Sequence, residues 1–209
     1  MSTILYDYWR SSAAYRLRIA LNLLGEPYER VSVDLLAGDH RGAANLARNK
    51  QGLVPSLQID DTMLVQSVAI LEYLDETRHA GFLPDDPLGR ARVRALSHAI
   101  AMEIHPVCNL SVAKFGAEIS DGTLDMKGWM HEFIPPRLAA FEAMLDDPAT
   151  GTFCHGDGVT MADLCLVPQI YNARRWEIDL SPLPRIRDIM SRLEQSPAIA
   201  AAHPDQVKP

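Results

Sequence analysis

The first eighty residues alternate strand-like and helix-like segments, and this alternation restricts the fold more than any other feature of the chain. Runs of apolar and aromatic residues predict strands, while apolar residues three and four positions apart predict helices. The expected elements, in chain order, are strand 4–9, helix 13–24, strand 28–35, helix 40–48, strand 54–59, strand 63–65 and a helix that begins at Ser67. The order β-α-β-α-β-β-α predicts an α/β unit in this half of the chain.

The last helix of this unit is amphipathic. Ile70, Leu71 and Leu74 share one face, whereas the acidic residues, Asp75 among them, are expected to turn away from it. A stretch rich in Gly and Pro then breaks the periodicity and predicts a linker. All later segments are helical in pattern, with expected helices at 88–117, 124–145, 160–174 and 184–194. The expected organisation is an α/β domain at 1–80, a linker at 81–87 and an all-helical domain at 88–209.

Composition and charge exclude several classes of function. The 209 residues include 20 basic and 27 acidic side chains, and no cluster of Lys or Arg offers a surface for phosphates. We therefore expect no nucleic-acid partner. The N-terminal residues carry no basic segment followed by an apolar one, which predicts a cytoplasmic protein without a membrane span. The three cysteines have no metal-ligand spacing and predict neither a disulfide framework nor a metal site.

One helix start in the second half is marked clearly. Thr160 followed three residues later by Asp163 predicts a capping box, and Val159 and Leu164 lie where a hydrophobic staple forms. The cap accounts for the carboxylate, so Asp163 is interpreted as a folding signal and not as a catalytic acid.

The first strand-to-helix turn is the expected place for chemistry. The β-α-β-α-β-β-α order with Val54-Pro55 opening the third strand is thioredoxin-like. A redox enzyme of that fold needs Cys at this turn, where the helix N-terminus stabilises a thiolate. Here the turn contains Ser11 and Ser12. A ligand must therefore bring the nucleophile, and glutathione is the candidate, since a serine hydroxyl can donate a hydrogen bond to its sulfur. The alternative is that Ser11 and Ser12 only cap the helix.

Two further turns support a ligand. A cis Val54-Pro55 bond would leave the Val54 backbone free to pair with a peptide-like molecule. Gln66-Ser67 opens a helix, where a hydroxyl and unpaired N–H groups can hold a carboxylate.

Five motifs resemble those of zeta-class glutathione transferases, a family that includes cis-trans isomerases, and the resemblance covers almost the whole chain. The motifs are Tyr8-Trp9-Arg10-Ser11-Ser12, Arg16-Leu17-Arg18-Ile19-Ala20-Leu21, Gln66-Ser67, Asp163-Leu164-Cys165-Leu166-Val167-Pro168-Gln169 and Asn172-Ala173-Arg174-Arg175. The resemblance implies a homodimer whose subunits have a thioredoxin-like domain and an all-helical domain.

By the same resemblance, Ser11 or Ser12 activates the thiol of glutathione, with Ser11 favoured. The resemblance gives a glutathione-binding set of Ser11, His40, Gln51, Val54, Pro55, Gln66, Ser67, His105 and Asn109. Substrate is expected in a cleft between the domains, with Arg10, Arg175 and Ser111 on its carboxylates. His105 is expected to contact ligand and not to transfer a proton. Two departures are Ala13, where many members have Cys, and Lys50, where relatives commonly have Pro.

The implied activity is the glutathione-dependent cis-trans isomerisation of a small diketo dicarboxylic acid. Maleylacetoacetate, converted to fumarylacetoacetate in tyrosine and phenylalanine breakdown, is favoured over maleylpyruvate, because some maleylpyruvate isomerases place Arg where this chain has Ser111. Two alternatives stay open. One is a detoxifying glutathione transferase, whose pocket should be mostly apolar. The other is a non-catalytic module, which would not need to retain the turns at Ser11-Ser12, Val54-Pro55 and Gln66-Ser67 together.

Overall fold

The chain forms two compact units in the computed structural model, which describes residues 2–209. The first unit comprises the described residues up to 82 together with 194–209, and the second comprises 83–193. The sequence-based division differs at the C-terminus, because it assigned all of 88–209 to the helical domain. The last sixteen residues instead pack on the α/β unit, where the buried Arg18 donates a hydrogen bond to the Ala202 carbonyl.

The first unit contains the predicted β-α-β-α-β-β-α order. Its strands are β1 (Thr3–Asp7), β2 (Tyr28–Ser32), β3 (Ser56–Ile59) and β4 (Thr62–Val65). They form one sheet in the order β2-β1-β3-β4, in which β1 and β2 are parallel and the other two pairs are antiparallel. The thioredoxin-like fold class predicted from the sequence is thus confirmed. The segment predicted as helix 40–48 is a short 3-10 turn, Asp39–Arg41, followed by α2 (Ala43–Arg48).

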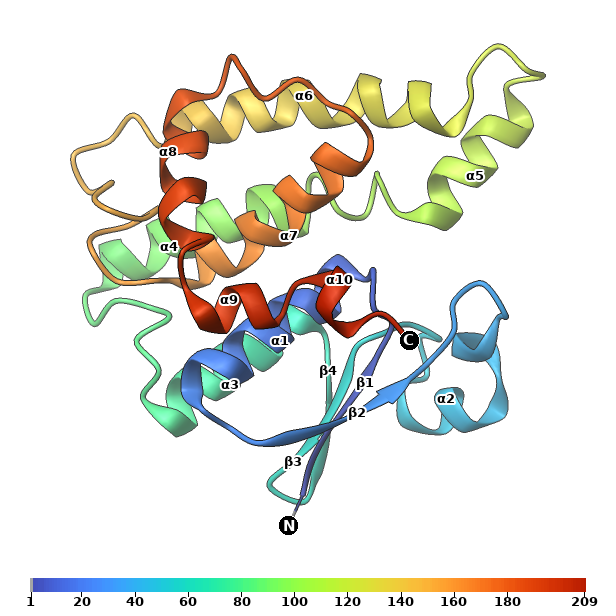
Figure 1. The fold of residues 1–209 in the computed structure, drawn as a ribbon, viewed down its shortest axis with the longest axis horizontal. Helices are drawn as coiled ribbons and strands as arrows, with labels where there is room; N and C mark the ends of the chain where they lie inside the picture. Colours follow the sequence, from blue (N-terminus) through green and yellow to red (C-terminus); the bar gives the residue numbers. More distant parts are fainter. Residues whose placement is uncertain (1) are drawn as a thin grey trace. The chain divides into compact units, whose positions relative to one another are not determined.

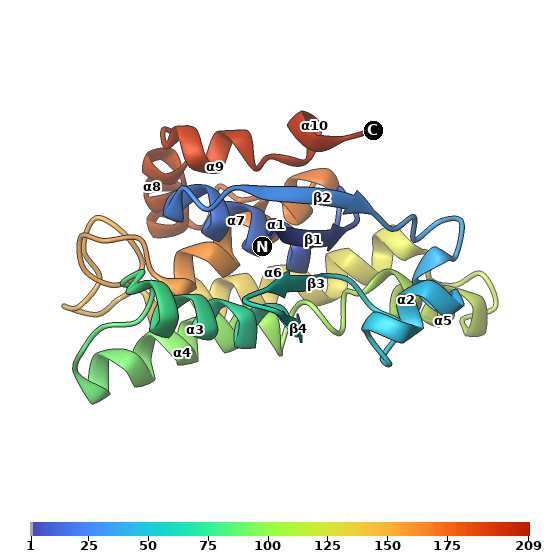
Figure 2. The ribbon, with the colours of Figure 1, turned by 90° about the horizontal axis from the view of Figure 1, so that it is seen from below.

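Helix α1 (Ser12–Leu24) is the centre of this unit. It is buried on every side over residues 14–21, because α3 (Ser67–Arg78) lies beside it and the short C-terminal helix α9 (Pro197–Ala201) packs against it (Figures 1 and 2). Gly25, with φ of 63°, ends the helix in the left-handed conformation that glycine adopts without cost. A helix enclosed in this way positions its N-terminal residues rigidly.

The hairpin between β3 and β4 turns at Asp60-Asp61, as predicted, with both residues at positive φ. Tyr73 and Arg78 of α3 donate hydrogen bonds to the Asp60 carboxylate at 2.7 Å, and these bonds lower its pKa to about 2.

The expectation that Asp75 faces away from the core is wrong. Asp75 is buried, and its Oδ1 accepts a hydrogen bond from the Phe82 backbone at 2.7 Å, which ties the end of the unit to α3.

The second unit is helical throughout its named elements. These are α4 (Pro87–Ala101), α5 (Leu110–Ile119), α6 (Met126–Met144), α7 (Met161–Arg175) and α8 (Pro184–Leu193). The predicted single helix 88–117 is wrong, because the helix stops after Ala101 and restarts at Leu110. Asn109 caps the new start by accepting a hydrogen bond from Ser111 N at 3.1 Å. Pro106 lies inside the break, where its missing N–H prevents a continuous helical ladder.

The capping box at the start of α7 is confirmed. The Asp163 carboxylate accepts hydrogen bonds from Thr160 N at 2.8 Å and from Cys154 N at 2.9 Å. Burial raises the pKa of this carboxyl group, and the hydrogen bonds oppose that effect. Asp163 therefore joins the loop before α7 to the helix itself, as its interpretation as a folding signal required.

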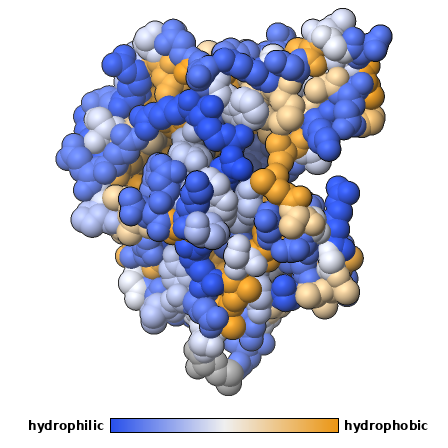
Figure 3. Space-filling model, turned by 45° about the vertical axis from the view of Figure 1, so that its right-hand side comes forward, coloured by the Kyte–Doolittle hydropathy of each residue, from blue (hydrophilic) through white to orange (hydrophobic). Residues whose placement is uncertain are grey.

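No helix within residues 2–209 is long and apolar enough to cross a membrane. The face drawn in Figure 3 is largely hydrophilic, and apolar side chains appear on it as separate patches. All three cysteines are buried and none forms a disulfide within the described residues, and burial raises the pKa of Cys108 to about 11.

The C-terminal segment is held to the first unit by Arg18. This side chain is fully buried and pairs with the Asp7 carboxylate at 2.8 Å. Its Nε donates to Ala202 O at 3.0 Å, and its Nη2 donates to Trp9 O at 3.0 Å. Arg30 reaches the same carboxylate at 3.1 Å and donates to Val207 O at 2.8 Å. The buried ion pair thus joins β1, the turn after it and the chain end.

We expect Arg18→Met to lower the free energy of unfolding by about 3–5 kcal/mol, because it leaves a buried carboxylate short of its partner. Urea denaturation followed by circular dichroism measures the change. Arg187→Met, at an exposed position on α8, is the matched control and should change stability by less than about 0.5 kcal/mol. A loss below about 1 kcal/mol for Arg18→Met would show that the pair does not hold the unit together.

Candidate functional site

The N-terminus of α1 carries the two serines predicted as thiol activators. Ser11 is the N-cap, and its Oγ accepts a hydrogen bond from Ala14 N at 3.2 Å. Ser12 is the first residue of the helix, and its hydroxyl has no partner within the described chain. Both side chains are half-buried. Ser11 therefore caps the helix, and its hydroxyl hydrogen stays available to a ligand, since the cap uses only an oxygen lone pair.

The N-terminus of α3 forms a second cluster. Gln66 has φ of 69°, an uncommon value for a residue other than glycine, and its side chain makes no cap. It instead donates a hydrogen bond to the Gln51 side chain at 2.8 Å. Ser67 is buried, and its Oγ accepts a hydrogen bond from Arg16 Nη1 at 3.1 Å. Positive φ at a helix start is typical of functional sites, where surrounding contacts maintain it.

The Val54-Pro55 peptide bond, in the loop before β3, is cis. The Val54 N–H and C=O have no hydrogen-bond partner among residues 2–209, whereas the neighbouring Leu53 carbonyl accepts from Asn45 and Asn49. Backbone groups left in this state can pair with an extended peptide in the manner of an added strand.

His40 contributes an unpaired ring atom. Its side chain is half-buried, and Nδ1 is buried without a partner in the described part of the chain. The His40 carbonyl is engaged by Asn45 Nδ2 at 2.9 Å, which fixes the backbone of the turn. Buried polar atoms without partners are rare in folded proteins, so this ring atom is available to a bound group or a water molecule.

These residues fit a peptide that carries a carboxylate. The Gln51–Gln66 bond connects the loop before β3 to the start of α3, and the Arg16–Ser67 bond connects α1 to the same start. Free donors, one strand-like backbone segment and a hydroxyl at a helix N-terminus are what the backbone and carboxylate of glutathione require. Ser11, Ser12 and Pro55 lie on the same first unit. Their roles toward a ligand stay predictions.

Arg10 follows the first strand and makes no ion pair within the described residues. Its guanidinium lies 4.6 Å from the centre of the Trp9 ring, and Nη2 donates to Tyr8 Oη at 3.3 Å. Arg10 therefore belongs to no surface ion pair among the described residues. A half-buried arginine without a carboxylate partner can bind an anionic ligand.

The remaining predicted residues lie on the second unit. His105 and Asn109 fall in the break between α4 and α5, and both are half-buried. Ser111 is exposed, and its hydroxyl donates to Asn109 Oδ1 at 3.0 Å. Arg175 ends α7, is exposed, and lies 4.9 Å from the centre of the Trp176 ring. The Ser111 hydroxyl is thus engaged with the residue that caps the helix, which weakens it as a hydrogen-bond donor to a substrate carboxylate.

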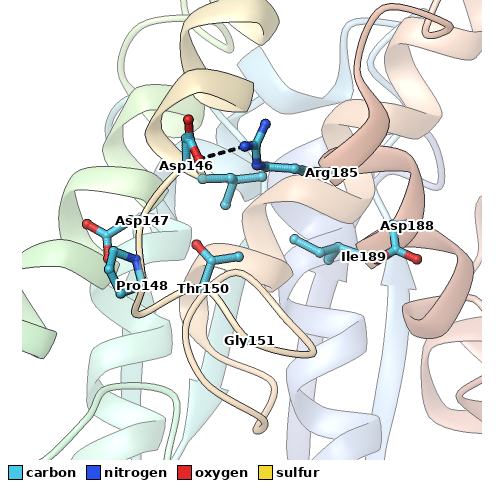
Figure 4. Close-up of a pocket in the computed structure, with 9 residues that line it drawn as sticks. Asp146, Asp147, Pro148, Thr150, Gly151, Arg185, Asp188 and Ile189 are labelled. Atoms are coloured by element: carbon cyan, nitrogen blue, oxygen red, sulfur yellow. Dashed lines mark hydrogen bonds and ion pairs between the residues drawn. The ribbon is translucent and has the colours of Figure 1, made fainter.

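A pocket of about 490 Å³ lies elsewhere on the second unit (Figure 4). Its walls come from α8 and from the end of α6 with the loop that follows. Arg185, its one basic lining residue, is paired with Asp146 at 2.6 Å, so its charge is already neutralised. The pocket contains none of the predicted site residues, and its open polar walls do not indicate a site.

Sequence reasoning missed one residue of the α3 cluster. Arg16 was quoted only as part of a motif, yet it is buried against Ser67. Two arginines, Arg16 and Arg18, within an otherwise apolar helix were the available signal, since arginine is rarely buried unless it has a partner.

Known proteins match the chain over nearly its whole length. Residues 1–76 match the family model "Glutathione S-transferase, N-terminal domain", and residues 110–202 match "Glutathione S-transferase, C-terminal domain". Maleylacetoacetate isomerase of Rhizobium meliloti (strain 1021) is 61% identical over 209 residues, which cover 99% of this chain and 98% of that protein.

Solved structures agree with these matches. A bacterial maleyl pyruvate isomerase, described as a zeta-class glutathione S-transferase, is 38% identical with a TM-score of 0.93 over 98% of both chains. Maleylacetoacetate isomerase from Methylobacterium extorquens AM1, with bound malonate and glutathione, is 39% identical with a TM-score of 0.91 over 97% of both chains. The chain therefore belongs to the glutathione S-transferase family, and within it to the zeta class of maleylacetoacetate and maleylpyruvate isomerases.

Ser11→Ala and Ser12→Ala separate capping from thiol activation. If Ser11 donates to the sulfur, Ser11→Ala should raise the pKa of bound glutathione by about 1 to 2, since hydrogen bonds to charged groups contribute about 1.5–3 kcal/mol. Turnover near neutral pH should fall and partly recover at high pH. Thiolate absorbance across a pH titration measures the pKa.

Ligand-free unfolding supplies the control. Ser11→Ala removes a cap and should cost about 1 kcal/mol, whereas Ser12→Ala should cost almost nothing, since the Ser12 hydroxyl makes no bond within residues 2–209. An unchanged thiol pKa in either variant would remove that serine from the role.

Proposed function

We propose that this protein is a glutathione-dependent cis-trans isomerase that converts maleylacetoacetate to fumarylacetoacetate. The observation that carries the proposal is a thioredoxin-like unit with serine, and no cysteine, at the N-terminus of α1, beside unpaired groups that fit a carboxylated peptide. The 61% identity to a maleylacetoacetate isomerase over almost the full length supports the same activity.

The site residues of the first unit have distinct parts in the proposed reaction. Bound glutathione supplies the sulfur nucleophile whose reversible addition permits rotation about the former double bond. Ser11 donates a hydrogen bond that favours the ionised sulfur, with Ser12 as the second candidate. The Val54 backbone aligns the peptide, and Ser67 holds a carboxylate.

Two arginines serve the substrate in this proposal. Arg10 has no carboxylate partner in the described chain, so its guanidinium group is available to a dicarboxylic acid. The same group can stabilise the negative charge that develops on the conjugated carbonyl oxygen. Arg175 is proposed for the second carboxylate. The relative from Methylobacterium extorquens AM1, solved with malonate and glutathione, supports a site that accepts a small dicarboxylate. A cytoplasmic homodimer is also part of the proposal, supported by the family resemblance.

Glutathione binding tests the first step. The proposal predicts that calorimetry with millimolar glutathione gives a measurable heat, and that the ligand raises the melting temperature, because a ligand that binds only the folded state stabilises it. Absence of both effects would favour a non-catalytic module of this fold.

Activity assays separate the enzymatic alternatives. Isomerisation without consumption of glutathione supports the proposal. A net loss of glutathione into adducts, without isomerisation, would favour a detoxifying transferase.

The choice of substrate depends on Ser111. Its hydroxyl already donates to Asn109, and a neutral donor binds a carboxylate less strongly than a guanidinium does. We expect kcat/KM, with glutathione saturating, to be higher for maleylacetoacetate than for maleylpyruvate. Ser111→Arg should move the ratio toward maleylpyruvate by about 10-fold, corresponding to one contact of about 1.4 kcal/mol.

Val112→Arg is the matched control, because it places the same charge at the adjacent exposed position of α5. It should leave the ratio within about twofold of the wild type if the charge must occupy position 111. A wild-type preference for maleylpyruvate would overturn the substrate choice, and an unchanged ratio in Ser111→Arg would show that this position does not set it.

A further inference from the structure

The start of α3 has an unusual surplus of hydrogen-bond donors. The backbone N–H groups of Ser67, Val68 and Ala69 have no acceptor within residues 2–209, and no side chain caps the helix. The first turn contains no acidic residue, so the positive end of the helix dipole is not neutralised by its own sequence. An anion at this position would satisfy several donors together.

Arg16 adds a buried charge behind this helix start. Its side chain is 3% exposed, and its one hydrogen-bond partner in the described chain is Ser67 Oγ, at 3.1 Å. The Arg16 Nε atom is buried without a partner, and no carboxylate pairs with the guanidinium among the described residues. Arg18, two residues along the same helix, is equally buried but has the Asp7 carboxylate at 2.8 Å. A buried cation without a counter-charge indicates that a ligand supplies it.

The direction of the Arg16–Ser67 bond determines what Ser67 can do. Arg16 can only donate, so Ser67 Oγ is the acceptor, and the single hydroxyl hydrogen is left over. That hydrogen has no acceptor within residues 2–209, and the guanidinium hydrogens repel it from their own side. It is therefore directed away from Arg16, and the hydroxyl can donate to a ligand at the helix start.

We propose that Arg16 is a positioning residue for ligand binding: it orients the Ser67 hydroxyl as a donor and supplies the buried positive charge that a carboxylate at the α3 N-terminus neutralises. The assignment rests on the proposed function, by which Ser67 holds a carboxylate of glutathione, and it takes that carboxylate to be the one on the γ-glutamyl residue. Arg16 acts through Ser67 and through its charge, and it takes no part in the bond changes of the reaction.

The test uses glutathione and an analogue that lacks only this carboxylate, 4-aminobutanoyl-cysteinylglycine. Calorimetry gives the ratio of their dissociation constants for the wild type, Arg16→Gln and Arg16→Lys. We expect the wild type to prefer glutathione strongly and Arg16→Gln to lose about 10- to 100-fold of that preference, with affinity for the analogue unchanged. Arg16→Lys keeps the charge without the fork and should lie between them.

Kinetic and stability measurements distinguish positioning from a structural role. With Arg16→Gln, KM for glutathione should rise while kcat at saturating glutathione changes little, because the reacting atoms are not touched. The ligand-free variant should be as thermally stable as the wild type or more so, since it removes an uncompensated buried charge. Stabilisation by glutathione should be smaller than in the wild type.

Arg30→Gln is the matched control, since Arg30 is an arginine of the same unit whose partners are Asp7 and Val207. It should lower stability without changing the preference for glutathione over the analogue. A folded Arg16→Gln or Arg16→Lys variant that retains the full wild-type preference would overturn the assignment alone. A wild-type protein that binds neither compound would overturn the proposed function and the assignment with it.

Discussion

The fully buried pair between Arg18 and Asp7 is the interaction on which the first unit depends. Arg18 uses its remaining donors on the carbonyls of Trp9 and Ala202, so one side chain fixes the turn before α1 and the C-terminal segment together. Burying two charges is costly unless every lone pair and proton finds a partner, and here the partners come from three separate segments. The position of Ser11, two residues beyond Trp9, is a consequence of this arrangement.

Two helix N-termini then provide what a ligand can use. At α1, Ser11 caps the helix through its oxygen and keeps its hydrogen, and at α3, Ser67 accepts from Arg16 and likewise keeps its hydrogen. In both places a structural bond occupies the acceptor and leaves the donor. Polar atoms without partners are uncommon in folded proteins, and in the first unit His40 Nδ1 and Arg16 Nε are among them. Both atoms belong to residues that we propose to serve ligand binding.

In the second unit, the residue that secures the fold and the residue proposed to set specificity lie in different parts of the sequence. Asp163 secures the loop before α7 from a buried position, and substituting it would affect folding before it affected chemistry. The break between α4 and α5 has the opposite character, because Asn109 and Ser111 form a cap near the surface. Relatives with different substrate names share this fold at TM-scores above 0.9, so the fold alone does not choose the substrate.

The sequence by itself determined the order of strands and helices, the Asp60-Asp61 turn, the capping box at Thr160 and the family, because each depends on local pattern or on a motif. Tertiary structure decided what local pattern cannot encode. The helix predicted over 88–117 breaks at Pro106 and Asn109. Asp75 is buried, where its carboxylate accepts a hydrogen bond from Phe82 N. Residues 194–209 join the first unit, where Arg18 donates to the Ala202 carbonyl. Arg16 and Arg18 have the same side chain on the same helix, and only their neighbours in space, Ser67 and Asp7, make one a candidate for ligand binding and the other a structural ion pair.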